Sequence, residues 1–359
     1  MRIRSLSLVL MVAAGCGGAE PHGRQDPILS PNLTTPVWPE LAGAGGAGAG
    51  NTGAGSAGST DADAGRAALP GALADVQFTL DVKLPAGAER LECMYAAMPS
   101  DRGVIAVPSA ESHYTPGSHH LLAYRTDLTS IPFDKPGIWD CTNDASWILH
   151  NRGSYYEAQQ PDSHRELPPG VAHEFDPGEV ILLQSHYVNT TDAEVQAHVE
   201  LTLHTIEIAR VTQEAGSIIF SNINIRIPAH AKWRVTMTCK LPQDIHPAEL
   251  WSHMHKQAVS FVATSDDTTA NPALGNTLYT ELEWSEPQPR IYPRDPPITL
   301  HAGTNVTFSC DYANDTNKVI SYGDSAQTNE MCIFHGMYWP RMAASAEQCR
   351  DGKMSAKSL

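Results

Sequence analysis

Two histidines separated by one residue give the strongest local sign of metal chemistry in this 359-residue sequence. His253 and His255 flank Met254 in a segment that begins with Trp251. Alternate residues of a β-strand point to the same face, about 7 Å apart along the backbone, so both imidazoles can converge on one ion without strain. The pair by itself leaves open which metal is bound and which third ligand completes the site.

Other histidines and one methionine are weaker candidates when taken alone. His119 and His120 are adjacent, and neighbours on a regular strand point to opposite faces. They can share a metal only if the backbone bends or if the ring nitrogens nearest the chain are used. His186 lies alone in an apolar stretch, which is typical of a hydrogen-bonded core histidine, and Met331 alone indicates an ordinary core methionine.

The segments around these residues have the period of β-strands. Apolar residues occupy every second position over residues 76–84, 233–239 and 306–310, which predicts strands with one buried face. Turn clusters at 168–170 and 176–178 separate such segments, and no long amphipathic helix is evident. We therefore expect an all-β chain with two tandem antiparallel, jelly-roll-like β-sandwiches and the active site in the cleft between them.

The N-terminus predicts export. Two arginines precede an apolar stretch at residues 6–14 that is too short to span a bilayer. Small residues from Ala13 lead into Cys16, as in a bacterial lipoprotein signal, although a larger aliphatic residue is usual in place of Ala13. We expect Cys16 to carry a lipid that anchors the protein in the bacterial cell envelope, at the outer membrane. An ordinary signal peptide with an incidental cysteine is the alternative.

Composition separates a tether from the folded part. Residues 42–65 are almost entirely small or polar, and a coil of about 50 such residues reaches about 40 Å. The net charge of −16 disfavours nucleic acid as a partner, and the lipid is the only membrane contact expected. The predicted organisation is a signal peptide at 1–16, a tether at 17–71, β domains at 72–210 and 211–352, and a tail at 353–359.

The cysteines predict a disulfide framework. Lipidation of Cys16 leaves an even number in an oxidising compartment, which indicates three disulfides among the 15 pairings that six cysteines allow. The sequence alone does not choose among these pairings. No Cys-x-x-Cys pair is present, which argues against a thiolate zinc or redox site. The six cysteines are Cys93, Cys141, Cys239, Cys310, Cys332 and Cys349.

Met331 lies in the segment Asn329-Glu330-Met331-Cys332, which resembles the Glu-Met-Cys segment of the copper type II, ascorbate-dependent monooxygenases. This family includes peptidylglycine α-hydroxylating monooxygenase and dopamine β-monooxygenase, and the resemblance extends in order over residues 74–350. It implies two copper ions. One would be held by a His-His pair and a distant histidine, the other by a His-x-His pair and the methionine. The implied ligands are His119, His120 and His186, and His253, His255 and Met331.

The resemblance also implies pairings and an activity. The implied disulfides are Cys93–Cys141, Cys239–Cys349 and Cys310–Cys332. The implied reaction hydroxylates a C–H bond of a small molecule or peptide with O₂ and ascorbate or another one-electron reductant. His253, His255 and Met331 would form the catalytic site. A thioether suits Cu(I), whereas zinc sites use Cys, His and carboxylate.

Two residues depart from the peptide-amidating branch of that family. Trp251 replaces an arginine that binds the peptide carboxylate, and His335 replaces a tyrosine that helps to hold the same substrate. Peptidylglycine is therefore disfavoured. Trp251 could form an aromatic wall of the substrate site or be an ordinary packed residue, and His335 could be a base, a hydrogen-bond donor to substrate or an exposed residue.

Two other functions remain open from the sequence. The same fold could sequester or transfer copper in the periplasm without hydroxylase activity. Histidine pairs alone are also compatible with a zinc hydrolase or a structural zinc protein. The sequence predicts no particular oligomeric state.

Overall fold

The computed structural model describes residues 69, 71–115, 118–267, 276–343 and 347–355. The predicted signal peptide, its Cys16 and nearly all of the tether lie outside these residues. The described chain consists of β-strands and two short 3₁₀ helices, at Ala145–His150 and Ile208–Arg210. None of its helices has the length and apolar character needed to cross a membrane.

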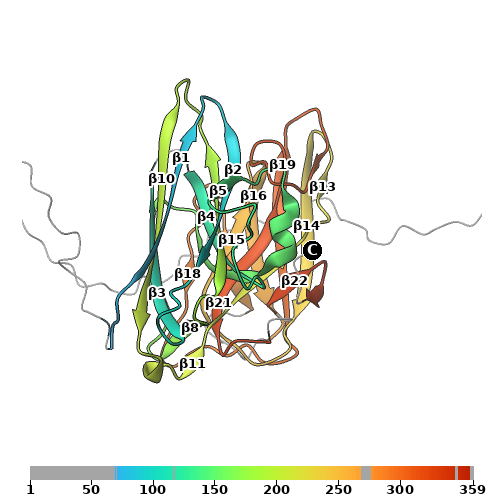
Figure 1. The fold of residues 1–359 in the computed structure, drawn as a ribbon. Coiled ribbons are helices and arrows are strands. Elements are labelled where there is room, and N and C mark those ends of the chain that lie inside the picture. Colours follow the sequence, from blue (N-terminus) through green and yellow to red (C-terminus); the bar gives the residue numbers. More distant parts are fainter. Residues whose placement is uncertain (1–68, 70, 116–117, 268–275, 344–346, 356–359) are drawn as a thin grey trace, which may run out of the picture.

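The first body is formed by two sheets, drawn in blue to yellow-green in Figure 1. One sheet runs in the order β1 (Val76–Leu84), β10 (Val195–Ile206), β3 (Ile105–Tyr114), β8 (Val171–Phe175) and β11 (Gln213–Glu214), with β7 (Asp162–Glu166) also paired to β3. The other runs β5 (Ile138–Asp140), β2 (Glu89–Ala97), β9 (Val180–Val188), β4 (Ser118–Thr126) and β6 (Asn151–Ala158). The second of these sheets carries the predicted histidines of the first domain.

The second body contains two larger sheets and a short strand pair, drawn mainly in yellow to red. Its six-stranded sheet runs β18 (Arg290–Ile291), β15 (His246–Met254), β21 (Cys332–Trp339), β12 (Gly216–Ser221), β22 (Gln348–Arg350) and β23 (Lys353–Ser355). Its four-stranded sheet runs β14 (Ala231–Lys240), β19 (Asn305–Asn314), β16 (Ala258–Ser265) and β17 (Thr277–Glu281). The pair is β13 (Arg226–Ile227) and β20 (Ile320–Ser321).

The strands follow the alternation read from the sequence. Burial alternates at every residue of β1, with its apolar side chains inside. Aromatic rings fill the second core, where Phe261, Phe308 and Phe334 have centroids 5.7 to 6.0 Å apart. The prediction of an all-β fold with two sandwich-like bodies is confirmed. The chain changes bodies between β11 and β12, just after the predicted boundary at residues 210 and 211.

Three disulfides tie these strands together. Cys93–Cys141 joins β2 to the residue after β5, Cys239–Cys349 joins β14 to β22, and Cys310–Cys332 joins β19 to β21. These are the pairings that the family resemblance implied. Disulfides persist in oxidising compartments, so they indicate a location outside the cytoplasm.

Removing the two disulfides of the second body one at a time shows which bridge affects stability alone and which also affects metal binding. Loop closure predicts that Cys239→Ala with Cys349→Ala destabilises by about 5 kcal/mol and Cys310→Ala with Cys332→Ala by about 3 kcal/mol, because the bridges span 110 and 22 residues. Only the second pair adjoins Met331, so only its loss should weaken a metal held by Met331. Urea unfolding and copper titration measure the two effects. Equal loss of copper affinity in both variants would contradict this assignment.

His173 lies where the chain passes between the bodies. Its Nδ1–H donates to the carbonyl of Ala215 over 3.1 Å, and the ring is buried. Burial, followed by the nearby guanidinium groups of Arg125 and Arg341, lowers the pKa of His173 from 6.5 to about 3. Between pH 6.5 and about 3, His173 is therefore neutral in the folded protein but protonated in the unfolded chain.

The depressed pKa of His173 predicts a loss of stability in acid. The folded-state pKa lies below the unfolded one, so stability falls as pH drops from 6.5 toward 3, by about 1.4 kcal/mol per pH unit from this residue. His173→Phe removes the titration, and the stability difference between parent and variant should shift by about 2 kcal/mol between pH 7 and pH 5. Urea unfolding of both proteins across this range measures it. Parallel pH curves would refute the prediction.

Candidate metal centre

The adjacent pair His119 and His120 meets both conditions set by strand geometry. Ser118 pairs with Tyr187 and His120 with His186, so His119 is an extra residue in β4, a β-bulge. A bulge bends its strand and redirects a side chain. The Nδ1 atoms, which are the ring nitrogens nearest the chain, lie 3.1 Å apart. The backbone thus bends, and the two near nitrogens face one another.

His186 completes a group that we call the all-histidine set: His119, His120 and His186. One ring nitrogen from each lies within 4.8 Å of the others. Two nitrogens bound to one ion at about 2.0 Å each would lie about 3 Å apart, close to the observed separation of the Nδ1 pair. His186 Nε2 contacts Glu89 Oε1 at 3.2 Å, whereas His186 Nδ1 is buried without a hydrogen-bond partner. That orphaned nitrogen is available to a metal.

His253 and His255 lie at and just after the end of β15, and both rings have one nitrogen engaged. His253 Nδ1 contacts Gln159 Oε1 at 2.9 Å, and His255 Nδ1 contacts the Asn329 carbonyl at 3.2 Å. Both acceptors are oxygens, so each Nδ1 carries the proton and each Nε2 keeps its lone pair. His255 Nε2 is buried without a partner. Histidines that bind metals are oriented in this way.

Met331 joins these two histidines in what we call the methionine set: His253, His255 and Met331. His253 pairs with Ile333 and Met254 with Cys332 in the β15–β21 ladder. One further step in this register brings Met331 opposite His255. All three residues line the same cavity, and the Tyr312 hydroxyl holds the Met331 carbonyl at 2.8 Å.

Glu330 fixes the turn that carries His255. Its carboxylate accepts the backbone N–H of His255 at 3.0 Å and that of Gln257 at 2.5 Å, and the residue is fully buried. Burial raises the pKa of Glu330 to about 8, while hydrogen bonds from the backbone oppose the shift. The glutamate of Glu-Met-Cys is thus a positioning residue for the histidine across the ladder.

Burial keeps the imidazoles in the form that binds metals. Desolvation lowers the pKa of His119 to about 4 and that of His255 to about 3. The same cause lowers the pKa of His120 and of His253. Neutral imidazole is the form that binds a metal, so the rings are ready for ligation at neutral pH.

The two sets are neighbours. The ring centroids of His120 and His253 lie 5.3 Å apart, and those of His253 and His255 lie 5.1 Å apart. Within the all-histidine set the centroids are 5.1 to 5.3 Å apart. Five imidazoles from both bodies therefore form one continuous group.

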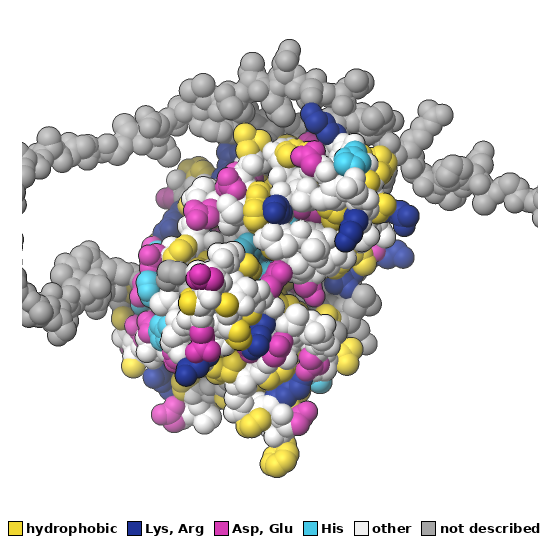
Figure 2. Space-filling view, turned by 90° about the horizontal axis from the view of Figure 1, so that it is seen from above, with side chains coloured by type: hydrophobic (Ala, Val, Ile, Leu, Met, Phe, Trp, Pro, Cys, Tyr) yellow, Lys and Arg dark blue, Asp and Glu magenta, His cyan; other side chains and the backbone are white. Residues whose placement is uncertain are grey.

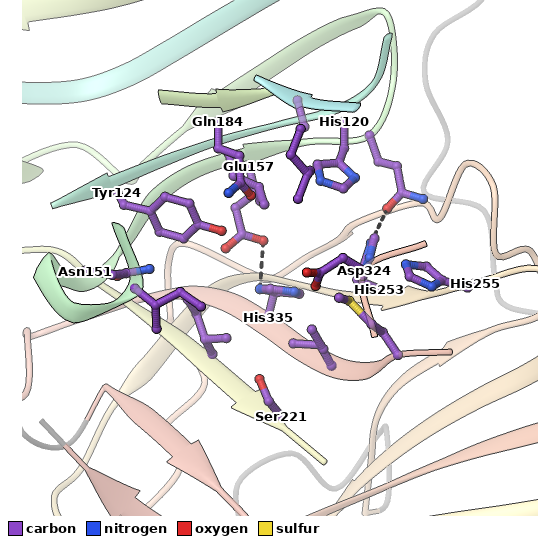
Figure 3. A pocket seen from close by; sticks show the side chains of 18 of the residues that line it. His120, Tyr124, Asn151, Glu157, Gln184, Ser221, His253, His255, Asp324 and His335 are labelled. Atoms are coloured by element: carbon purple, nitrogen blue, oxygen red, sulfur yellow. Dashed lines mark hydrogen bonds and ion pairs between the residues drawn. The ribbon is translucent and has the colours of Figure 1, made fainter. Parts of the chain in front are cut away.

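A cavity of about 330 Å³ opens onto this group between the bodies. Figure 3 shows His120 and Glu157 pointing from one side toward His253, His255 and His335 on the other. The apolar walls of the cavity consist largely of Leu122, Tyr124, Trp147, Ile219, Trp251 and Ile333. Of the all-histidine set only His120 lines the cavity, whereas every member of the methionine set does. A molecule in the cavity therefore lies nearer the methionine set.

Trp251 and His335 lie beside the methionine set. They pair directly across β15 and β21, and their rings stack with centroids 5.8 Å apart. His335 Nδ1 lies 2.7 Å from Glu157 Oε2 of the first body, with both side chains buried. The distance is that of an ion pair, although the angle is not that of a hydrogen bond. Arg165 lies 5.1 Å from the centre of the Trp251 ring, which gives that ring a cation–π contact.

The donor atoms fit copper. The fit is judged from the donor atoms: the facing Nδ1 atoms of His119 and His120, the orphaned nitrogens of His186 and His255 and a thioether at the cavity wall. Imidazole suits copper in either oxidation state, and thioether suits Cu(I). No disulfide cysteine adds a thiolate, since all six lie in disulfides.

Three residues of the site carry no signal in the sequence that singled them out: Glu89, Glu157 and Gln159. They are polar side chains in or next to strands of the five-stranded sheet, on the face that carries His120 and His186. Residues two apart on a strand share a face, so Glu157 lies on the same face as Gln159, and Glu89 on the same face as Leu91. This alternation alone does not reveal that the shared face packs against a sheet of the second body.

Glu330 provides a test of positioning. Glu330→Ala leaves two buried N–H groups without an acceptor, which should destabilise by about 3 kcal/mol and weaken metal binding about 10- to 100-fold. Glu330→Gln keeps one acceptor oxygen and should lose less. Cu(I) competition with a coloured chelator measures affinity, and urea unfolding measures stability.

Gln327→Ala is the control for the Glu330 variants, because this residue lies in the same loop and its exposed side chain accepts from the Lys256 amine at 3.3 Å. It should bind Cu(I) like the parent. Parent-like affinity in Glu330→Ala would show that the hydrogen bonds to the His255 turn do not position this ligand.

Comparisons with solved structures and curated proteins find only distant likenesses. Among solved structures, PNGase F, a glycosylasparaginase from Flavobacterium meningosepticum, is 9% identical over 74% of this chain and 95% of its own, with a TM-score of 0.30. PBCV-1 VP54, fitted into a reconstruction of the virophage Sputnik, is 7% identical over 74% of this chain and 94% of its own, with a TM-score of 0.24. Such low scores carry no functional conclusion. No curated protein matches significantly.

A family model gives the informative match. It covers residues 213–356, a range that includes His253, His255 and Met331 and begins at β11. The all-histidine set lies before it. Residues 213–356 therefore match the model of the copper type II ascorbate-dependent monooxygenase C-terminal domain.

Proposed function

We propose that this protein is a copper-dependent monooxygenase that hydroxylates a C–H bond of a small molecule, using O₂ and a reductant such as ascorbate. The observation that carries the proposal is the convergence of His253, His255 and Met331 on one cavity, within a domain matched to this enzyme family. The all-histidine set beside them supports a second copper.

Each set has a defined part in the proposed reaction. His119, His120 and His186 would hold one copper, and His253, His255 and Met331 would hold the other. Bound copper supplies one-electron redox chemistry and a position for O₂. The chain orients its ligands through Gln159, Asn329 and Glu330, and burial lowers the pKa of His119, His120, His253 and His255 and so keeps these four imidazoles neutral.

The cavity supports a substrate with an apolar reacting group. The stacked Trp251 and His335 form a wall next to His253, and we assign both to substrate contact. The Glu157 carboxylate holds His335 in place, so the His335 ring presents a fixed edge to the cavity. A volume of about 330 Å³ lies at the lower end of small-molecule sites, which favours a small molecule over a peptide.

The location follows from the disulfides and the predicted signal. The disulfides support an oxidising compartment. We propose further that Cys16 carries the lipid and that residues 17–71 tether the two bodies to the envelope. The face in Figure 2 carries both acidic and basic side chains.

Copper content and O₂ uptake test the proposed function. The parent, offered both copper and zinc, should retain two copper ions, and Met331→Ala should weaken one of them. With ascorbate and a panel of apolar and aromatic small molecules, the copper-loaded parent should consume O₂ in a substrate-dependent manner. Elemental analysis and an oxygen electrode are the measurements.

Met354→Ala is the matched control, because Met354 is a part-buried methionine of the same body outside the cavity lining. It should behave as the parent. Tight copper binding without O₂ uptake on any substrate would favour copper sequestration instead. Retention of zinc with no copper would favour a zinc protein.

A further inference from the structure

Glu89 of the first body links a ligand histidine to the second body. On β2 it lies diagonal to His186, which pairs with Leu91 on the neighbouring strand. One carboxylate oxygen contacts His186 Nε2 at 3.2 Å and accepts the N–H of Ala326 at 3.2 Å. The other accepts the Ser325 hydroxyl at 3.1 Å. The same carboxylate thus orients a ligand of one body and docks a loop of the other.

The docked loop is the segment that holds His255. The Asn329 N–H donates to the Ser325 carbonyl over 2.9 Å, which closes the turn. The Asn329 carbonyl then accepts from His255 Nδ1, and Glu330 accepts the His255 backbone N–H. A continuous path of hydrogen bonds and a short loop therefore joins His186 to His255.

Gln159 makes a second link between the bodies, but the ligand that it contacts belongs to the other body. This residue of the first body accepts from Nδ1 of His253, a ligand in the second body, over 2.9 Å. Its amide nitrogen donates to the carbonyls of Trp284 and Ser285, over 2.9 and 3.1 Å. The Trp284 ring in turn stacks on His119 with centroids 6.3 Å apart. Only a side chain that both accepts and donates satisfies these partners.

Both links would respond to a bound metal. With Nδ1 of His186 engaged as a ligand, its Nε2–H would be a stronger donor to Glu89. The stronger contact would hold Glu89 against Ser325 and Ala326, and thereby the loop that orients His255. Likewise, a His253 ring fixed by ligation would hold Gln159 and the loop that places Trp284 against His119.

We propose that Glu89 and Gln159 couple the two ligand sets, so that an ion held by one set raises the affinity of the other set for its own ion. Both are positioning residues, since neither supplies a ligand. The inference rests on the proposed copper binding. Coupling is reciprocal by linkage and typically amounts to 5- to 150-fold, and we expect about tenfold.

A double-mutant cycle on metal affinity tests the proposal. The all-histidine set is disabled by His119→Ala with His120→Ala, and Cu(I) affinity of the methionine set is measured by chelator competition, with copper–sulfur scattering in X-ray absorption to identify that set. Disabling should lower this affinity about tenfold in the parent. In a background of Glu89→Ala with Gln159→Ala, it should cause no further loss.

Control variants separate coupling from general damage. Ser325→Ala removes one cross-body hydrogen bond but keeps the contact between Glu89 and His186, so it should reduce the coupling in part. Glu92→Ala removes another buried carboxylate of β2, one paired with Arg90 of the same strand at 3.7 Å, and should leave the coupling intact.

Amide hydrogen exchange of metal-free protein tests the contact of Glu89 with the loop directly. Exchange at Ala326 and Asn329 should be faster in Glu89→Ala, and Glu89→Gln should partly restore protection.

The outcomes are distinguishable. A parent that binds two copper ions whose affinities are independent would overturn this inference alone. Coupling that persists without Glu89 and Gln159 would do the same. A parent that binds no copper would overturn the proposed function together with this inference. Coupling in the parent and its loss in the Glu89 and Gln159 background would support it.

Discussion

The structure depends on two sheets that turn polar rows toward each other across the boundary between the bodies. Buried polar groups need partners, and an isolated charge there would be strongly destabilising. The partners come from the opposite body: Glu157 meets His335, and Arg165 meets Glu249 at 3.4 Å. In the same layer, His186 and His255 each have one nitrogen at an oxygen and the other without a partner. The interface is therefore both the packing surface of the bodies and the metal centre.

The two ligand sets reach this layer by different means. The methionine set uses regular strand parity, since His253 on β15 and His255 just after it share a face and Met331 adjoins the facing strand. A disulfide from Cys332 and the carboxylate of Glu330 fix the end of that ladder next to His255. The all-histidine set needs an irregularity, the bulge at His119. A bulge leaves backbone groups outside the ladder, and contacts from the second body cover this side of the site.

Much of the fold and part of the site could be predicted from residue types and spacing. Period-two alternation determined the β class, because a half-buried strand must alternate. The same geometry showed that His253 and His255 share a face. For His119 and His120 the spacing gave only the two alternative conditions, a bent backbone or the use of near nitrogens. His186 and Met331 carried no local signal, and their grouping with the others came from a family resemblance, which the match over residues 213–356 supports in part.

By itself, then, the sequence determined the strand periods, the same-face pair His253 and His255, and an even set of cysteines for an oxidising compartment. Only the tertiary structure decided that the ligand sets touch, at 5.3 Å between His120 and His253, and that Glu89 and Gln159 bridge the bodies. The physical reason is the distance along the chain over which each effect acts. Alternation is fixed by the backbone within a few residues, whereas the partner of a buried polar group is chosen by the packing of sheets that are distant in sequence.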